Sequence, residues 1–210
     1  MKPMQAWFTM FVLLAAAGAR AQDVTPEARR VADRLAATTC STCHGTAGRS
    51  VSPIFPNLAA QTAPYIEEQL KAFRDQSRAD PDAEAYMWGM ASQLNDATIS
   101  ALAAHYAAQS PATGHVGDSK SIARGKATFQ QGVPTKGIPA CATCHGEHAQ
   151  GNGPFPRLAG QHADYLLKQL LVIQSVLRLA PVMHGVIQNL SRDQMRDVAV
   201  YLESIGPTTK

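Results

Sequence analysis

The sequence of 210 residues has few aromatic side chains, no basic run and only four cysteines. Aromatic residues make up 6% of the chain and are not interleaved with basic clusters, which argues against nucleic-acid binding. The cysteines are not scattered along the chain, as they would be in a disulfide-stabilised scaffold. Beyond the N-terminal segment, no apolar run approaches the length that spans a bilayer. The sequence therefore predicts a globular chain with no nucleic-acid partner.

The one long apolar run lies at the N-terminus and has the features of a secretory signal peptide. Lys2 provides a positive start, and Trp7–Ala17 is an apolar run shorter than a membrane span. Ala19-Arg20-Ala21 then fits the small-x-small pattern of a cleavage site. We predict that residues 1–21 are a signal peptide and that the protein is periplasmic, with an uncleaved anchor as the alternative.

The charge is distributed unevenly along the chain. The formal net charge of +3 includes Lys2 and Arg20, so the chain from Gln22 onward is close to neutral. Residues 22–110 contain seven basic and ten acidic side chains, whereas residues 111–210 contain ten basic and six acidic ones. Such a dipolar molecule would orient in the field of a charged partner, although for any single residue ordinary solvated surface is the simpler interpretation.

Two segments about one hundred residues apart repeat each other. Phe55–Leu70 and Phe155–Leu170 are identical at nine of sixteen positions, reading F-P-x-L-A-x-Q-x-A-x-Y-x-x-x-Q-L. Met87–Leu94 similarly matches Met183–Leu190. A period near one hundred residues indicates duplicated domains, because solenoid repeats are much shorter. We predict the following division: signal peptide 1–21, first domain 22–110, linker 111–121 and second domain 122–210.

The apolar residues of both units follow helical spacing. Ile66, Leu70 and Phe73 stand at i, i+4 and i+7, and the second unit repeats this pattern. Val31 and Leu35 share one face of an expected first helix. No segment shows the sustained alternation of a strand, so the sequence predicts an all-α fold.

Two finer features of the helical pattern can be placed from the sequence. Ser191 and Gln194 have the spacing of a capping box at the start of the last helix. Arg74–Tyr86 is expected to be a polar loop that accounts for the few extra residues in the first unit.

Both units contain C-x-x-C-H, which is the attachment motif of c-type haem. One turn of backbone brings two thiols to the two vinyl groups at the porphyrin edge, and the next residue offers its imidazole to the iron. Two thioether bonds would keep the haem on a small exported protein. The predicted attachment residues are Cys40 and Cys43 with His44, and Cys141 and Cys144 with His145.

Three other uses of C-x-x-C fit the sequence less well. A structural zinc site usually places its second pair closer and does not need two adjacent histidines. A dithiol redox site would leave the histidines unexplained and lacks its usual βαβ context. A disulfide within C-x-x-C would be strained and labile. The sequence therefore predicts two covalently bound haem c groups.

Methionine residues are available for the sixth iron position, where Met favours electron transfer. Met183 lies in a Pro-Val-Met segment before the last helix of the second unit. Met87 aligns with Met183 in the repeat, whereas Met90 aligns with Val186, an apolar packing position. We therefore predict Met87 and Met183 as axial ligands, with Met90 the alternative in the first unit.

Pro56 and Pro156 occupy the same place in the duplicated F-P-x-L segment. A histidine that binds a metal usually donates its second N–H to a carbonyl or a carboxylate. Each proline carbonyl could accept that bond, and a structural turn is the alternative role. The other histidines have no matching partner in the repeat and are expected to be surface or ordinary helix residues: His105, His115, His148, His162 and His184.

Together, CSTCHG, FPNLAAQ and MWGMASQL with CATCHG, FPRLAGQ and MHGVIQNL resemble the two halves of a dihaem cytochrome c4. The resemblance implies two tandem class I cytochrome c domains related by a pseudo-twofold axis. It also implies His/Met ligation, by His44 with Met87 and by His145 with Met183, and the proline-carbonyl role for Pro56 and Pro156. The chain departs from the family where His105 replaces the usual Tyr.

The resemblance implies a monomeric periplasmic electron shuttle without catalytic residues, working in a respiratory chain toward a terminal oxidase. Expected partners are a redox donor and acceptor, namely a cytochrome bc-type complex, a terminal oxidase or a dehydrogenase, met in transient contact with membrane complexes. Two alternatives remain: a haem enzyme or a gas- or peroxide-binding sensor with one open iron, and an electron-accepting subunit of a dehydrogenase. The acidic half is expected to hold the haem that is harder to reduce.

Overall fold

The computed structural model describes residues 24–207, so the predicted signal peptide lies outside the described part. These residues form helices and irregular segments, with two isolated β-bridges and no strand. The predicted all-α fold is therefore confirmed. Between residues 24 and 207, no helix is long and apolar enough to cross a membrane.

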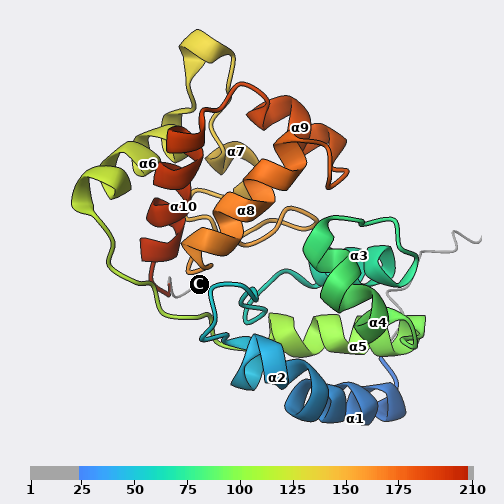
Figure 1. Ribbon diagram of the computed structural model, residues 1–210. Helices are drawn as coiled ribbons and strands as arrows, with labels where there is room; N and C mark the ends of the chain where they lie inside the picture. The colour runs from blue at the N-terminus through green and yellow to red at the C-terminus, as the bar shows by residue number, and fades with distance from the viewer. Residues whose placement is uncertain (1–23, 208–210) are drawn as a thin grey trace, which may run out of the picture.

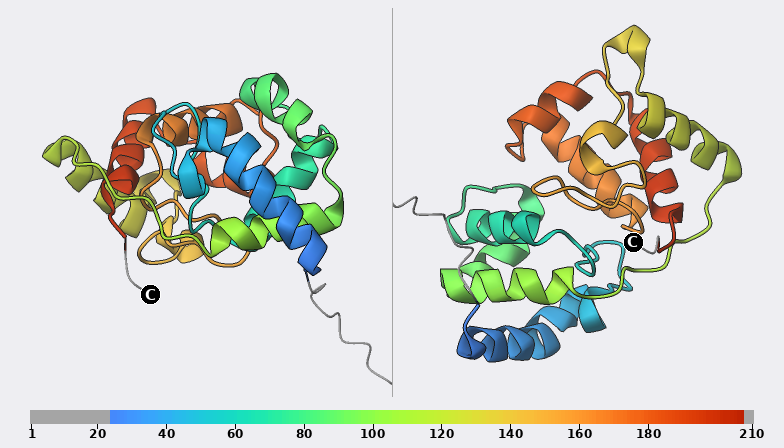
Figure 2. Two further views of the ribbon diagram at one scale, coloured as in Figure 1. Left: turned by 90° about the horizontal axis from the view of Figure 1, so that it is seen from below. Right: turned by 180° about the vertical axis from the view of Figure 1, so that it is seen from behind.

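The helices form two groups that follow each other along the chain and lie side by side (Figures 1 and 2). The first group is α1 (Pro26–Leu35), α2 (Ser41–His44), α3 (Ala63–Arg74), α4 (Trp88–Ala91) and α5 (Asp96–Ala107). The second group is α6 (Ser119–Gln131), α7 (Ala142–His145), α8 (Ala163–Gln174), α9 (Pro181–Ile187) and α10 (Arg192–Ser204). Four short turns complete the assignment: the π-helical turns Ala36–Cys40 and Ala83–Met87 and the 3₁₀ turns Thr46–Gly48 and Pro134–Lys136.

Side-chain caps fix where the long helices begin. Thr25 Oγ1 accepts from the amide of Ala28 at 3.2 Å, and Pro26 follows as the first helical residue of α1. At α10, Ser191 and Gln194 form the predicted capping box, which satisfies two amides that a helix start leaves free. Caps of this kind typically stabilise a helix by about 1 kcal/mol.

Each group has a core where its first and last long helices cross. In the first group α1 presents small residues to α5, with Ala28, Ala32 and Ala36 all buried. In the second group α6 presents Gly125 and Phe129, and the ring of Phe129 packs against Tyr201 of α10 at a centroid distance of 5.7 Å. The two halves thus build the same helix crossing from different side chains.

Two sequence-based expectations about packing need correction. The most buried face of α1 is formed by Ala28 and Ala32. Val31 lies on the adjacent face and is 38% exposed. Met90 is 59% exposed, because α4 is a single turn whose buried side is occupied by Ala91. By contrast, Ile66 and Phe73 of α3 are buried as the helical spacing predicted.

The connection between the halves is partly helical at its end. Asp118 caps α6 by accepting from the amide of Ser121 at 2.7 Å, so residues 119–121 of the predicted linker belong to the helix. The extended part runs along the end of α10, where the amide of His115 donates to the carbonyl of Glu203 at 3.1 Å. The proposed domain boundaries at residues 110 and 122 remain a prediction.

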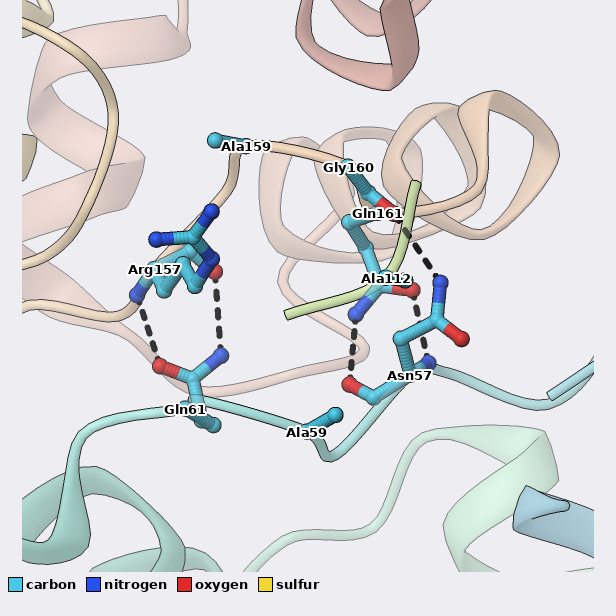
Figure 3. A pocket seen from close by; sticks show the side chains of 8 residues that line it. All are labelled: Asn57, Ala59, Gln61, Ala112, Arg157, Ala159, Gly160 and Gln161. Atoms are coloured by element: carbon cyan, nitrogen blue, oxygen red, sulfur yellow. Dashed lines mark hydrogen bonds between the residues drawn. The ribbon is translucent and has the colours of Figure 1, made fainter. Parts of the chain in front are cut away.

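A pair of glutamines joins the halves by matched hydrogen bonds (Figure 3). The Gln61 side chain bonds both the amide and the carbonyl of Arg157, at 2.6 and 2.9 Å. The Gln161 side chain bonds the amide and the carbonyl of Asn57 in the same way, at 2.8 and 2.9 Å. Each glutamine is one hundred residues from its counterpart and serves the backbone of the opposite half, as a pseudo-twofold axis requires.

Two arginines extend this interface. Arg78 donates to Gln69 at 2.7 Å and to Gln169 at 2.9 Å, and Arg178 donates to Gln169 at 2.6 Å and to Gln69 at 2.9 Å. Arg78 also pairs with the fully buried Asp80 at 2.8 Å. The segment expected to be a simple polar loop therefore contributes a buried ion pair to the interface.

Candidate metal centres

Each C-x-x-C-H motif ends in a single helical turn, which is α2 in the first half and α7 in the second. In the first half a π-helical turn leads from α1 directly into Cys40, and α2 carries Cys43 and His44. In the second half Cys141 directly precedes α7, which carries Cys144 and His145. Residues three apart lie on the same side of a helix, so the two thiols of a pair can reach one edge of a planar group.

The structure brings each histidine to the proline of its own half. His44 Nδ1 donates to the carbonyl of Pro56 at 2.9 Å, and His145 Nδ1 donates to the carbonyl of Pro156 at 2.9 Å. Phe55 and Phe155 meet these imidazoles edge to face, at centroid distances of 6.2 and 6.3 Å. Two segments far apart in sequence thus reproduce one geometry to within 0.1 Å.

These contacts prepare both imidazoles to bind a metal. Because Nδ1 is held by a carbonyl, which can only accept, the proton is on Nδ1 and Nε2 is left to coordinate. Burial lowers the pKa of His44 and of His145, although the bonds to the proline carbonyls oppose this in part. Both rings are therefore neutral at pH 7, the form that binds a metal.

Glycine follows the histidine in both motifs because the chain reverses there. Gly45 has φ +74° and Gly146 has φ +85°, a region that L side chains rarely adopt. A Cβ on Gly45 would stand 1.9 Å from the carbonyl oxygen of Arg49. This turn sends the chain back toward the proline that holds the histidine.

No disulfide joins the cysteines within residues 24–207, so all four sulfur atoms are available for thioether bonds. Burial raises the pKa of the Cys40 thiol, with the Tyr106 hydroxyl acting in the opposite direction, and raises that of Cys141 to about 11. Within residues 24–207, no three side chains of the Cys, His, Asp or Glu type are grouped to hold a metal ion. The two pairs therefore do not meet in a four-thiolate zinc site.

The methionines predicted as axial ligands have matching surroundings. Met87 ends a π-helical turn and packs, partly buried, beside the apolar cluster of Phe73, Ala83 and Ala91. Met183 lies in α9 and packs beside the corresponding cluster of the second half. Both side chains are thus partly covered, whereas Met90 is turned to solvent.

The side chains present fit a covalently attached haem. Each half offers two thiols, a neutral imidazole with Nε2 available and a partly buried thioether, the donor set of a six-coordinate c-type haem. In addition, Arg157 Nε and Nη2 are buried without a hydrogen-bond partner in the described chain. Two buried nitrogens without a partner are consistent with a group outside the polypeptide at this place.

His162 is among the interface residues that were not foreseen from the sequence. His162, expected to be a surface or ordinary helix residue, is 7% exposed, and its Nε2 lies 3.0 Å from the carbonyl of Ser50 in the other half. Its position inside the duplicated F-P-x-L-A-x-Q-x segment was the available signal, because the neighbouring glutamines cross the interface as well.

Comparisons with known proteins agree on one family. The family described as Cytochrome c matches residues 32–107 and 122–206. Cytochrome c-552 of Acidithiobacillus ferridurans is 42% identical over 200 residues, covering 94% of this chain and 87% of that protein. A thiosulfate dehydrogenase electron acceptor of Thiomonas intermedia (strain K12) is 33% identical, covering 82% of each chain.

A solved structure extends the agreement to three dimensions. The cytochrome c4 of Acidithiobacillus ferrooxidans superposes with a TM-score of 0.75 at 46% identity, covering 79% of this chain and 98% of that one. Both tandem regions of the family match lie within the two helical groups described above. The chain belongs to the cytochrome c family, as a dihaem cytochrome c4 with two covalently bound haem c groups.

Proposed function

We propose that this cytochrome is a periplasmic electron shuttle whose two irons are both six-coordinate, with His and Met as axial ligands. In this proposal Cys40, Cys43, His44 and Met87 hold the first haem, and Cys141, Cys144, His145 and Met183 hold the second. Haem supplies one-electron exchange between ferrous and ferric iron. The polypeptide supplies the ligands, keeps the imidazoles neutral and partly covers the thioether groups of Met87 and Met183.

The observation that carries the proposal is the duplicated geometry at the two histidines. His44 and His145 each donate to a proline carbonyl at 2.9 Å, so both rings are held in one orientation. A rigid ligand keeps the iron surroundings nearly unchanged when an electron arrives, which suits transfer without substrate binding. Two equal centres in one chain favour a carrier over an enzyme that needs one open iron.

A second candidate function is supported by relatives described as electron acceptors of thiosulfate dehydrogenase. The Thiomonas intermedia protein that is 33% identical is described as a thiosulfate dehydrogenase electron acceptor. This favours a dehydrogenase as the electron donor for the present chain, in place of a cytochrome bc-type complex. A terminal oxidase is the proposed acceptor in both cases.

The visible spectrum of the intact protein with and without carbon monoxide tests the ligation. The proposal predicts two haems per chain, a methionine–iron charge-transfer band of full intensity and no shift when carbon monoxide is added to the reduced protein. Met87→Ala should open one iron, so that half of the haem binds carbon monoxide, while the exposed Met90→Ala should leave the spectrum unchanged. Carbon monoxide binding by the unaltered protein would favour the sensor or enzyme alternative.

Reduction kinetics separate the two candidate donors. Oxidised protein is mixed with a purified thiosulfate dehydrogenase and thiosulfate, or with a cytochrome bc-type complex and quinol. The dehydrogenase proposal predicts fast reduction and co-purification in the first case. Reduction only in the second case would assign the chain to a respiratory route without a dehydrogenase subunit.

A further inference from the structure

Three arginines are buried to the same extent in this molecule, but only two of them have partners. Arg78, Arg157 and Arg178 are each 8% exposed. Arg78 pairs with the carboxylate of Asp80, and Arg178 donates to two glutamines and to the hydroxyl of Tyr65. Arg157 Nε and Nη2 have no hydrogen-bond partner in residues 24–207.

An unpaired buried charge is costly, because water has been removed and nothing replaces it. Burial accordingly lowers the pKa of Arg157, yet a guanidinium remains charged at pH 7. Arg157 Nε and Nη2 can therefore be satisfied only by a group from outside residues 24–207, and an anion would balance the charge as well. Haem c carries two propionate carboxylates, and guanidinium binds carboxylate in a fork geometry.

The position of Arg157 in the chain places it next to a residue that contacts the predicted histidine ligand of the second haem. It directly follows Pro156, whose carbonyl holds the second predicted iron ligand, His145. Its backbone is fixed by Gln61, and Figure 3 shows the guanidinium turned away from that glutamine, toward the second half. The side chain is therefore anchored at the interface and directed into the half that contains α7.

The first half has no such cation at the equivalent place. Asn57 follows Pro56, and both ends of its side chain are bonded: Oδ1 accepts from the amide of Ser50 at 2.8 Å and Nδ2 donates to the carbonyl of Gly160 at 2.9 Å. The two halves thus share the proline–histidine contact and differ in the next side chain.

We propose that the Arg157 guanidinium pairs with a propionate of the second haem and raises the reduction potential of that haem above that of the first. The inference rests on the proposed ligation of the second iron. A nearby positive charge stabilises the ferrous state, which carries one positive charge less than the ferric state. Arg157 is a positioning residue here, because it acts through the propionate and not on the iron.

Site-resolved redox titration of the holoprotein tests this. Arg157→Asn, which copies the first half, should shift the ferrous–ferric equilibrium of the second haem about tenfold toward ferric, equivalent to ~59 mV for one electron. Arg157→Lys should retain most of the potential, because it retains the charge. The control Arg192→Asn removes an equal charge from an exposed position and should shift the second haem far less.

A shift in Arg157→Asn no larger than in Arg192→Asn would overturn the inference. Where Arg157→Asn fails to fold, a crystal structure of the unaltered holoprotein decides: a propionate oxygen within hydrogen-bond distance of the guanidinium supports the pairing, and a chloride or a water there contradicts it. If both haems are six-coordinate but the potential of the second haem does not change when Arg157 is replaced, the shuttle proposal remains intact and only this inference fails. Loss of the second haem from the unaltered protein would contradict both.

Discussion

In the first half residue 57 is an asparagine whose side-chain oxygen and nitrogen are both hydrogen-bonded, whereas in the second half residue 157 is an arginine with two buried nitrogens that have no partner in residues 24–207. The next difference lies at the interface, where Asp80 balances Arg78 while Ala180 stands near Arg178. The contact between histidine and proline carbonyl is nevertheless the same in the two halves. The duplicated halves therefore share this contact and differ in the charge around it.

The net charges of the halves agree with the local contacts, because the second half is the more positive in both. Residues 22–110 have three more acidic than basic side chains, and residues 111–210 have four more basic than acidic ones. Negative surroundings favour ferric iron, so the first haem should be the harder one to reduce. A carrier with unequal haems can receive an electron at one centre and hold it at the other.

The largest loss of stability is expected when the buried carboxylate of Asp80, at the interface, is removed. Asp80→Ala copies the second half but leaves Arg78 buried beside Gln69 and Gln169 without its counter-ion. The free energy of unfolding should fall by about 3–5 kcal/mol in urea titration. The exposed Asp75→Ala, whose partner Arg74 is at the surface, should change it by less than about 1 kcal/mol.

A double variant checks the cause of that loss. Arg78→Met combined with Asp80→Ala removes both charges and should recover part of the stability. Equal losses in the single and the double variant would mean that the ion pair is not the source.

The pseudo-twofold symmetry of the interface can be tested by replacing Gln61 and Gln161 one at a time. Gln61→Ala leaves the amide and carbonyl of Arg157 unpaired, and Gln161→Ala does the same to Asn57. Each variant should lose about 1–3 kcal/mol, the cost of unsatisfied buried backbone groups, with similar losses on the two sides. Hydrogen exchange should rise at the amide of Arg157 in Gln61→Ala and at the amide of Asn57 in Gln161→Ala.

The exposed Gln188→Ala serves as the matched control, with a change within about 0.5 kcal/mol. A large loss from only one of the two interface variants would show that the halves are docked less symmetrically than the contacts indicate.

A smaller effect on stability is expected where α6 crosses α10, and it should depend on pH. Asp197 of α10 accepts from Arg124 of α6 at 2.6 and 2.8 Å, and this bonding lowers the pKa of Asp197 below its ordinary 3.8. The first half has Ala101 at the matching position. A carboxyl with a lowered folded-state pKa adds stability above about pH 4, and that stability is lost as the pH falls through the folded-state pKa.

Asp197→Asn should therefore lower the melting temperature at pH 7 and have much less effect near pH 2. The change at pH 7 should be modest, since Arg124 is largely exposed. Asp193→Asn, at an exposed site of the same helix, is the control. An equal loss at both pH values would assign the effect to packing and not to the charge.

The smallest effect concerns the turn after α8. Val176 has φ +63°, a left-handed conformation that is unfavourable for a β-branched residue, and its side chain is exposed. Gln76 occupies the same turn in the first half with φ +57°. Val176→Asn should stabilise the protein by up to about 1 kcal/mol, and Gln76→Asn by less, as measured by thermal unfolding. Destabilisation by Val176→Asn would show that the valine makes a contact that outweighs its strain.

The sequence was sufficient for features set by local pattern or by direct repetition. Spacing predicted the buried faces at Ile66 and Phe73, and the capping box at Ser191 was recognisable from its two residues. Such features depend on neighbours within one or two turns of helix, so the pattern contains the information. The haem prediction likewise followed from five adjacent residues repeated twice.

The features that the sequence did not reveal depend on contacts between distant segments. Arg78 and Asp80 looked like parts of a solvated loop, yet Arg78 bonds Gln169, ninety-one residues away. His162 is buried because Ser50 of the other half lies against it. The repeated glutamines were the missed signal, since residues duplicated outside the apolar faces point to an interface between the copies.

The central claim, that equal ligand sets lie in unequal electrostatic surroundings, is tested most directly by spectroelectrochemical titration of the intact dihaem protein. Met87→Ala identifies the first haem in such a titration. The account predicts two one-electron steps, with the haem of His145 reduced at the higher potential. A single shared midpoint, or the haem of His44 at the higher potential, would contradict it.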